Sequence, residues 1–294
     1  MYRTHDRRKP QEVVFFTGSD RRAGNERENP MNIDLSGKTT IVTGSTGGIG
    51  LAIATGLASA GASVTIVGRT RERVDAAVAR VRKASGRDDA NGVVADVGTA
   101  EGCKALIAVR PDTDILVNNL GVYGTREFFD IDDARWDEYW QVNVMSGVRL
   151  GRHYARGMRE RGWGRIQFVS SESALNIPTE MVHYGANKSA VQGLSRGLAK
   201  VLAGTGVTVN TILPGPTRTE GGVAMMTELA ARRGVTPLEM EGLFLAENRP
   251  SNLLGRFATP EEVANLSVYV ASPQASATTG SALRADGGTV ETIA

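Results

Sequence analysis

KTTIVTGSTGGIG, at residues 38–50, joins a short β-branched run to a glycine-rich turn and the start of a helical pattern. The run is apolar on both faces, which is typical of a strand buried inside a parallel sheet. Glycines at such a turn let the backbone approach a pyrophosphate, because the free N–H groups and the dipole at a helix N-terminus favour anions. Taken alone, the glycines are also consistent with a plain tight turn.

Strand-like and helix-like segments alternate outward from this stretch. Further β-branched runs lie at 63–68, 91–96, 113–119, 164–170, 206–213 and 280–286. Helical patterns lie near 48–60, 71–84, 99–109, 133–160, 184–203 and 260–271. The alternation predicts an α/β fold, a Rossmann-type doubly wound parallel sheet of about seven strands with helices on both faces.

Two parts of the chain depart from this alternation. The first 30 residues carry seven Lys/Arg and five Asp/Glu around one apolar patch, VVFF. They lack the ~7–15-residue apolar core of a signal peptide and are too acidic for a mitochondrial presequence. We interpret 1–30 as a disordered extension, or Met31 as the true start, and 31–294 as one domain. Residues 214–259 interrupt the rhythm and fit a substrate lid, or a segment that packs on the domain or on a partner chain.

Composition and charge restrict the class of protein. The chain has 294 residues, 41% of them hydrophobic, with a formal net charge of +2. This profile predicts a soluble globular protein without strong attraction to nucleic acid, since no basic stripe with interleaved aromatics is present. No apolar run reaches the ~18 residues of a membrane span, and one cysteine fits a reducing compartment. We therefore expect a cytoplasmic protein that binds neither membrane nor nucleic acid.

HYGANK, at residues 183–188, places a tyrosine four residues before a lysine. On a helix, Tyr184 and Lys188 share one face, one turn apart. A free tyrosine has a pKa of ~10, and a neighbouring ammonium group stabilises the phenolate and lowers that pKa. The pair could therefore donate and accept a proton, although an exposed helix pair is the simpler interpretation when it is taken alone.

Together with the glycine spacing, this pair resembles the short-chain dehydrogenase/reductase family, and within it the 3-oxoacyl-[acyl-carrier-protein] reductases. The resemblance covers roughly residues 35–290 and rests on several motifs in the family's order. These are TGSTGGIG at 43–50, NNLG at 118–121, Ser171 thirteen residues before Tyr184, and PGPTRT at 214–219. One departure is Leu120, where the family usually has alanine; its bulk could press on the cofactor or reshape the turn.

The resemblance implies a role for each matching residue. The implied catalytic residues are Asn143, Ser171, Tyr184 and Lys188. Ser171 would bind the substrate oxygen that Tyr184 protonates, and Asn143 would hold a water behind Lys188. The implied cofactor contacts are Gly44, Ser45, Thr46, Gly48, Ile49, Gly50, Arg69, Asp96, Val97, Asn118, Gly121, Tyr184, Lys188, Pro214, Gly215, Thr217 and Thr219. No metal is implied.

The end of the second strand bears on the choice of cofactor. NAD-binding sites of this fold usually carry an acid about 20 residues past the glycines, for the ribose 2′-hydroxyl. Here Gly68 is followed by Arg69, with Arg71 close by, and an arginine can pair with a 2′-phosphate. Within the resemblance this implies NADP (NADPH) rather than NAD; an ordinary cation at a helix start is the alternative for Arg69.

We therefore expect an NADP(H)-dependent oxidoreductase that reduces a carbonyl group, or oxidises a secondary alcohol, by a Ser-Tyr-Lys mechanism. A 3-oxoacyl thioester, a cyclic ketone and a sugar all stay open as the small-molecule substrate. A non-catalytic dinucleotide-binding sensor or scaffold is the alternative class. The family's habit of forming tetramers implies a homo-oligomer, a dimer or a homotetramer.

Other reactive side chains receive structural interpretations. Cys103 is expected to be a small buried residue, and His153 and His183 lack metal-ligand spacing, although His183 could line the pocket. Glu172 directly follows Ser171. If Glu172 faced the phenol, its charge would oppose the lowering of the phenol pKa by Lys188. The alternative is that Glu172 points away, into a salt bridge or to solvent.

Overall fold

The computed structural model describes residues 32–293. Ile33–Ala294 forms one compact unit. The extension predicted at residues 1–30 lies outside the described residues. Among the helices of the described part, none is both long and apolar enough to cross a membrane.

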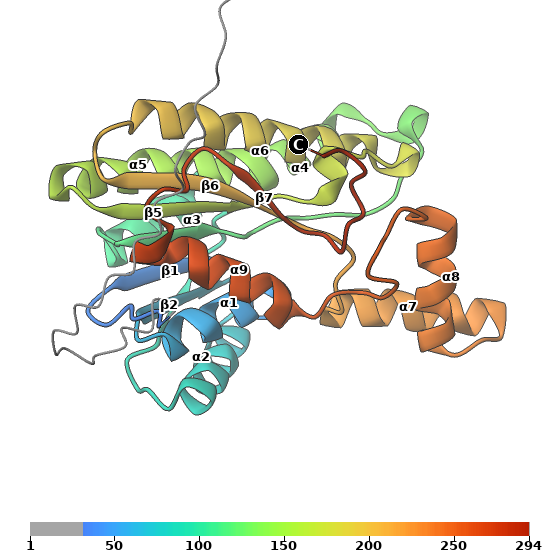
Figure 1. The fold of residues 1–294 in the computed structure, drawn as a ribbon, viewed down its shortest axis with the longest axis horizontal. Helices are drawn as coiled ribbons and strands as arrows, with labels where there is room; N and C mark the ends of the chain where they lie inside the picture. Colours follow the sequence, from blue (N-terminus) through green and yellow to red (C-terminus); the bar gives the residue numbers. More distant parts are fainter. Residues whose placement is uncertain (1–31, 294) are drawn as a thin grey trace, which may run out of the picture. The chain divides into compact units, whose positions relative to one another are not determined.

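A seven-stranded sheet forms the centre of this unit, in the order β3-β2-β1-β4-β5-β6-β7 (Figure 1). Its strands are β1 (Thr39–Thr43), β2 (Ser63–Gly68), β3 (Asn91–Val94), β4 (Ile115–Asn118), β5 (Gly164–Val169), β6 (Val207–Pro214) and β7 (Ala282–Ala285). All six pairings are parallel. The chain winds outward from β1 to β3, then crosses to β4 on the other side of β1. Ligands of open sheets bind at such a switch point, outside the carboxyl ends of the strands.

Helices cover both faces of the sheet (Figure 1). One face carries α1 (Gly48–Ser59), α2 (Arg71–Ser85) and α9 (Pro260–Ala271). The other carries α3 (Ala100–Val109), α4 (Asp133–Trp140), α5 (Ser146–Arg161) and α6 (Val182–Val201). Each face has its own apolar core, with Leu57 and Ile66 buried in the first and Leu150 and Phe168 in the second. The predicted doubly wound α/β fold is confirmed.

Glycine at position 50 allows α1 to start directly against the turn after β1. A Cβ atom at Gly50 would lie 2.5 Å from the carbonyl oxygen of Gly44 and 2.4 Å from Nδ2 of Asn119. Gly44 and Gly48 have φ angles of +61° and +54°, in the left-handed region that side chains disfavour. Backbone packing and backbone angles therefore require glycine at these positions, whether or not the turn binds a ligand.

Two segments differ from the regular pattern. The stretch 133–160 predicts one helix, but a π-helical turn (Gln141–Met145) separates α4 from α5. Such turns occur frequently at functional sites. Residues 214–259, called the lid segment below, leave the end of β6 and carry α7 (Glu220–Arg233) and α8 (Pro237–Asn248). These two helices pack on each other through a small core of their own, beyond the end of the sheet (Figure 1).

Candidate active site

The residues expected at the site lie at the carboxyl ends of neighbouring strands. In strand order from β1 to β6, they are Gly44, Arg69, Asp96, Asn118, Ser171 and Pro214. Because the strands are parallel, these ends meet at one edge of the sheet, as the fold requires. The structure thus brings together residues that are 170 positions apart at the extremes.

The first turn of α1 has backbone donors available for an anion. Its N-cap residue, Gly47, provides no side-chain hydrogen bond. The N–H of Gly48 donates to the carboxylate of Glu220 over 2.8 Å. Glu220 is the first residue of α7, so the lid segment places a carboxylate at a helix N-terminus, where anions are favoured. The turn therefore binds negatively charged oxygen, which is the chemistry that a pyrophosphate presents.

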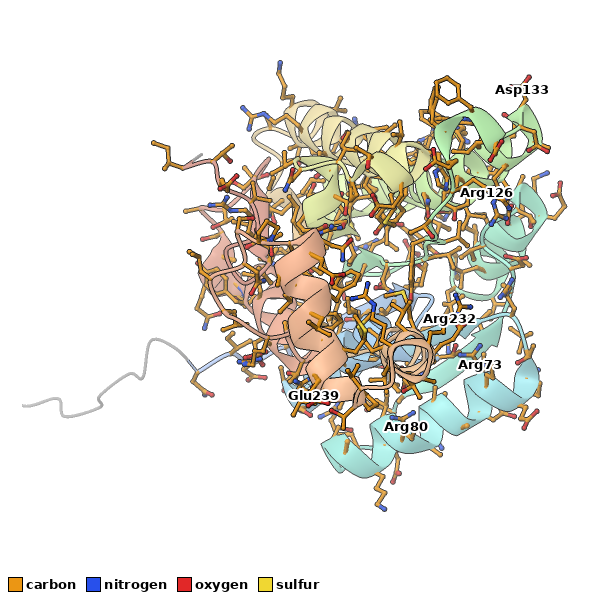
Figure 2. The ribbon with its side chains drawn as sticks, turned by 90° about the vertical axis from the view of Figure 1, so that its right-hand side faces the viewer. Arg73, Arg80, Arg126, Asp133, Arg232 and Glu239 are labelled. Atoms are coloured by element: carbon orange, nitrogen blue, oxygen red, sulfur yellow. The ribbon has the colours of Figure 1, made fainter. Side chains whose placement is uncertain are left out.

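Arginines of α2 approach the same turn. Nη1 of Arg80 lies 3.8 Å from the Glu220 carboxylate. Nη2 of Arg73 lies 3.7 Å from the position that a Cβ atom would take at Gly47. Figure 2 shows Arg73 and Arg80 along α2, the helix that follows β2. Arg73 gave no signal in the sequence, because only the tertiary structure brings the first turn of α2 next to the glycines.

Two further arginines lie at the end of β2. Arg69 is exposed and, within residues 32–293, its side chain makes no hydrogen bond or ion pair. Arg71 makes only a loose, exposed ion pair with Asp75 over 3.8 Å. Both guanidinium groups are therefore available for an anionic group of a ligand. At the end of β3, Asp96 is exposed and accepts a hydrogen bond from the N–H of Gly98 over 3.1 Å.

The turn after β4 is held by Thr43 of β1. The hydroxyl of Thr43 accepts hydrogen bonds from the N–H groups of Asn119 and Leu120, each over 3.0 Å. The side chain of Leu120 packs inward against the core beneath α3–α6, so the turn accommodates it. The neighbouring Oδ1 of Asn118 is buried and has no hydrogen-bond partner among the described residues. A buried acceptor without a partner at the end of a strand could accept a hydrogen bond from a ligand.

Tyr184 and Lys188 lie on one face of α6, as their spacing predicts. Nζ of Lys188 lies 5.6 Å from the centre of the Tyr184 ring and donates to the carbonyl oxygen of Val169, at the end of β5, over 2.9 Å. Ser171 follows the same strand, and its hydroxyl lies close enough to the phenol of Tyr184 to act on its pKa. The structure therefore brings a phenol, an ammonium group and a hydroxyl to one point.

Burial controls the proton affinity of both groups on α6. It raises the pKa of Tyr184 above its ordinary value, and the carboxylate of Glu172 raises it further, while the neighbouring Ser171 hydroxyl acts in the lowering direction. Burial lowers the pKa of Lys188 to about 8. The net shift in the pKa of the phenol is upward, and a lowering by Lys188 together with a bound cofactor stays a prediction. Desolvation of the phenol dominates, and the ammonium group is directed at Val169.

Asn143 lies in the π-helical turn and is buried. Its Oδ1 accepts from the N–H of Val122 over 2.8 Å, and its Nδ2 donates to the carbonyl oxygen of Val122 over 3.1 Å. A Cβ atom at Gly121 would lie 3.0 Å from Oδ1 and 3.2 Å from Nζ of Lys188. Asn143 and Lys188 thus approach the same glycine, and Asn143 anchors the loop after β4. Its role in holding a water stays a prediction.

Asn143→Ala is expected to lower the stability of the fold. The change leaves the N–H and C=O of Val122 without the partners that Asn143 provides, and an unsatisfied buried polar group costs about 1–3 kcal/mol. We expect a melting temperature lower by roughly 5 °C, at 2–4 °C per kcal/mol for a domain of this size. Asn143→Asp retains the acceptor and loses the donor, so it should fall between. An unchanged melting temperature in Asn143→Ala would contradict the anchoring role.

Two of the residues predicted to contact the cofactor have hydroxyls that bond the backbone in this structure, and their contact with a cofactor stays a prediction. Ser45 is fully buried, and its hydroxyl donates to the carbonyl oxygen of Val42 over 2.7 Å and accepts from the N–H of Val67 over 3.0 Å. It bridges β1 and β2. The buried hydroxyl of Thr217 donates to the carbonyl oxygen of Gly215 over 2.8 Å. Short side chains next to a turn can bond the backbone instead of a ligand, and sequence spacing does not separate the two uses.

The other predicted contacts differ in exposure. Gly50, Val97, Asn118 and Pro214 are buried, Arg69, Asp96 and Gly121 are exposed, and the half-buried set is Gly44, Thr46, Gly48, Ile49, Gly215 and Thr219. Thr219 caps α7 by accepting from the N–H of Gly222 over 3.1 Å. Their contacts with a cofactor stay predictions.

Cys103 and His183 are core residues. Cys103 is buried, and burial raises the pKa of its thiol to about 11. His183 is buried against the ring of Tyr139, 4.5 Å between centroids, and burial lowers its pKa. His183 therefore does not line the pocket.

Glu172 is the main site residue whose surroundings the sequence did not reveal. It is buried next to Ser171, and its partner is Arg249, at the end of α8 in the lid segment. Both alternatives considered from the sequence are partly right, since Glu172 forms a salt bridge and also lies near Ser171 and Tyr184. A lone arginine 77 residues away gave no signal.

Comparisons with known proteins give one family match and several similar chains. Residues 38–229 match the family model described as short chain dehydrogenase. The chain is 44% identical over 263 residues to the uncharacterized oxidoreductase YvaG of Bacillus subtilis, covering 90% of this chain and all of that protein. It is 33% identical to the 3-oxoacyl-[acyl-carrier-protein] reductase FabG of Aquifex aeolicus, covering 88% of this chain and 99% of that one.

A solved structure with the same fold carries a bound cofactor. The L-sorbose reductase of Gluconobacter frateurii, complexed with NADPH and L-sorbose, superposes with a TM-score of 0.84 at 34% identity. The match covers 90% of this chain and all of that one.

Proposed function

Because the chain belongs to the short-chain dehydrogenase/reductase family and is an oxidoreductase, we propose that it transfers hydride between NADP(H) and a carbonyl or secondary alcohol by a Ser-Tyr-Lys mechanism. The observation that carries the proposal is the convergence of Ser171, Tyr184 and Lys188 at the ends of β5 and α6. Non-catalytic use of the fold as a sensor or scaffold would not require these three groups to meet.

The chain's own residues support a bound NADP(H). The turn at Gly48 already accepts a carboxylate, so a pyrophosphate fits its donors. Arg69 and Arg71, exposed at the end of β2, suit a 2′-phosphate. The end of β2 carries no acidic residue that could bind a free 2′-hydroxyl instead. When bound, the cofactor supplies or accepts the hydride.

The protein residues would handle the proton. Tyr184 donates its phenolic proton to the substrate oxygen during reduction and accepts it during oxidation. Its raised pKa keeps the phenol protonated at neutral pH, which is the form that reduction needs. Ser171 orients the reacting oxygen beside Tyr184. Lys188, held by Val169, supplies a positive charge that stabilises the phenolate when it forms.

A polyhydroxylated ketone and a 3-oxoacyl thioester are the substrate classes that the relatives suggest. L-Sorbose is the ligand of one structural relative, and 3-oxoacyl-[acyl-carrier-protein] is the substrate in the name of another. A panel of L-sorbose, ethyl acetoacetate and cyclohexanone represents the sugar, oxoacyl and cyclic classes. Oxidation of NADPH by any of them supports the proposal. Tight NADPH binding without turnover of the panel or of the matching alcohols would favour the sensor or scaffold.

Glu220→Gln is expected to tighten NADPH binding. The carboxylate of Glu220 occupies the N–H of Gly48 and repels a phosphate at the same helix end. Charges at a helix N-terminus contribute about 1 kcal/mol, so the Kd should fall roughly fivefold. Glu228→Gln, an exposed change on the same helix, is the control and should leave the Kd unchanged. A weaker Kd in Glu220→Gln would show that the carboxylate assists binding.

Assembly is inferred from the family resemblance and location from the composition, and both remain predictions. We propose a homo-oligomer, a dimer or a tetramer, in the cytoplasm. Light scattering of the purified chain would give the mass of the particle.

A further inference from the structure

A buried ion pair lies directly behind Ser171. Glu172 is 4% exposed and Arg249 is 8% exposed. Nε of Arg249 donates to Oε1 of Glu172 over 2.8 Å. The other carboxylate oxygen, Oε2, accepts from the hydroxyls of Ser171 over 2.7 Å and Ser173 over 2.6 Å. Such pairs are weak evidence of stability, because desolvation offsets much of the attraction, so a role in the site is the better explanation to test.

The network fixes the direction of the Ser171 hydroxyl. A hydroxyl has one proton to donate, and a carboxylate is a stronger acceptor than a neutral oxygen. The Ser171 proton is therefore directed at Glu172, while the N–H of Ser173 donates to Oγ of Ser171 over 3.1 Å. The remaining lone pair of Oγ can accept a hydrogen bond from one O–H group, either the phenol of Tyr184 or the hydroxyl of an alcohol substrate.

Arg249 connects this network to the lid segment. It ends α8, where its N–H donates to the carbonyl oxygen of Leu245 over 2.8 Å. Another lid ion pair, Arg233 with Glu247, joins α7 to α8 within the segment and is exposed. Arg249 instead reaches out of the segment to the residue beside Ser171. The position of the lid segment and the orientation of Ser171 are thus physically linked.

We propose that Glu172 and Arg249 are positioning residues of the reaction: Glu172 aims the hydroxyl of Ser171, and Arg249 makes that aim depend on the lid segment. The proposal rests on the proposed function, since Ser171 and Tyr184 must be the reacting pair.

The pair also adjusts the charge that faces Tyr184. The titratable and charged groups around the phenol are Glu172 beside β5, Tyr123 in the loop after β4, Tyr139 of α4, Lys188 of α6, and Arg249 of the lid segment behind Glu172. Of these, Glu172 raises the pKa of Tyr184, and Arg249 offsets its charge. Removing the carboxylate should therefore lower the pKa of the phenol, and removing the guanidinium should raise it.

The test uses Glu172→Gln and Arg249→Met, which keep similar shapes, with Arg233→Met as the matched control for loss of a lid ion pair. Alcohol oxidation requires the phenolate, so its rate rises with pH up to the pKa of Tyr184. With the alcohol matching the fastest panel ketone, Glu172→Gln should displace the kcat/KM profile to lower pH by about one unit, and Arg249→Met to higher pH by about as much. The double variant should return toward wild type, and Arg233→Met should leave the profile in place.

A second measurement does not depend on turnover. Hydrogen exchange of the purified protein should become faster in α8 and in residues 171–175 of Arg249→Met, whereas Arg233→Met should affect only the contact between α7 and α8. If no panel compound reacts, the proposed function fails while this comparison still tests the link. Displacement of both pH profiles in one direction, or unchanged exchange around Ser171 in Arg249→Met, would overturn the proposal.

Discussion

Tyr184→Phe is expected to fold and to bind NADPH like the wild-type chain, while its turnover falls by a factor of about 10²–10⁴, the usual contribution of a general acid or base. The change removes the phenolic proton and retains the ring, which packs edge-on against Tyr123 at 6.4 Å between centroids. The measurement is kcat and kcat/KM for the fastest panel ketone, together with the Kd for NADPH.

Tyr154→Phe is the matched control for the loss of a tyrosine hydroxyl. Tyr154 is buried on α5, where its hydroxyl donates to the carbonyl oxygen of Arg110 over 2.7 Å. Loss of that hydrogen bond should lower the stability by about 1 kcal/mol and leave turnover unchanged. Turnover of Tyr184→Phe within threefold of wild type would refute the assignment of the proton donor.

Arg69→Asp is expected to weaken NADPH binding strongly and NADH binding little or not at all. Hydrogen bonds to charged groups contribute about 1.5–3 kcal/mol, so the lost contact alone should raise the Kd for NADPH roughly ten- to hundredfold. The new carboxylate repels a 2′-phosphate and can accept a bond from a free 2′-hydroxyl. Because Arg69 is exposed, salt will screen the repulsion, and both Kd values must be measured at one ionic strength.

Two other arginines provide the companion variants for this prediction. Arg71 could replace part of the lost contact, so the double change with Arg71→Ala should give the larger effect. Arg156→Asp, an exposed position on α5, makes the same change in net charge on the other face of the sheet and should leave both Kd values unchanged. A wild-type preference for NADH, or equal weakening of both cofactors by Arg69→Asp, would show that Arg69 does not select the 2′-phosphate.

The turn at the start of α1 shows how much of the structure the local sequence can predict. Glycine at 44, 48 and 50 was sufficient to place a strand-to-helix turn, and the structure explains each by backbone angle or close approach. The same local pattern predicted that Ser45 contacts the cofactor, whereas in the structure its hydroxyl bridges β1 and β2. A serine hydroxyl can bond a ligand or its own backbone, and only the position of β2 relative to β1 decides between them.

The proton affinity of Tyr184 is a second case. Spacing placed Lys188 on the same face of α6, and the structure agrees. The direction of the pKa shift could not be obtained from spacing, because it depends on how much of the phenol is buried and on which carboxylate lies near. Glu172 follows Ser171 in the chain, yet its effect depends on Arg249, which the lid segment brings from far along the sequence.

The sequence by itself determined the doubly wound fold, the edge of the sheet that carries the site, and the shared face of Tyr184 and Lys188, whereas the place of Ser171 beside them was implied by the family resemblance. The first three follow from periodicity, turn chemistry and strand–helix alternation, all of which are encoded locally. Tertiary structure alone decided that Glu220 occupies the helix N-terminus, that Glu172 holds the Ser171 hydroxyl, and that Arg249 links it to the lid segment. Those contacts join distant segments, and the free energy of a charged group depends on the burial and partners it meets there.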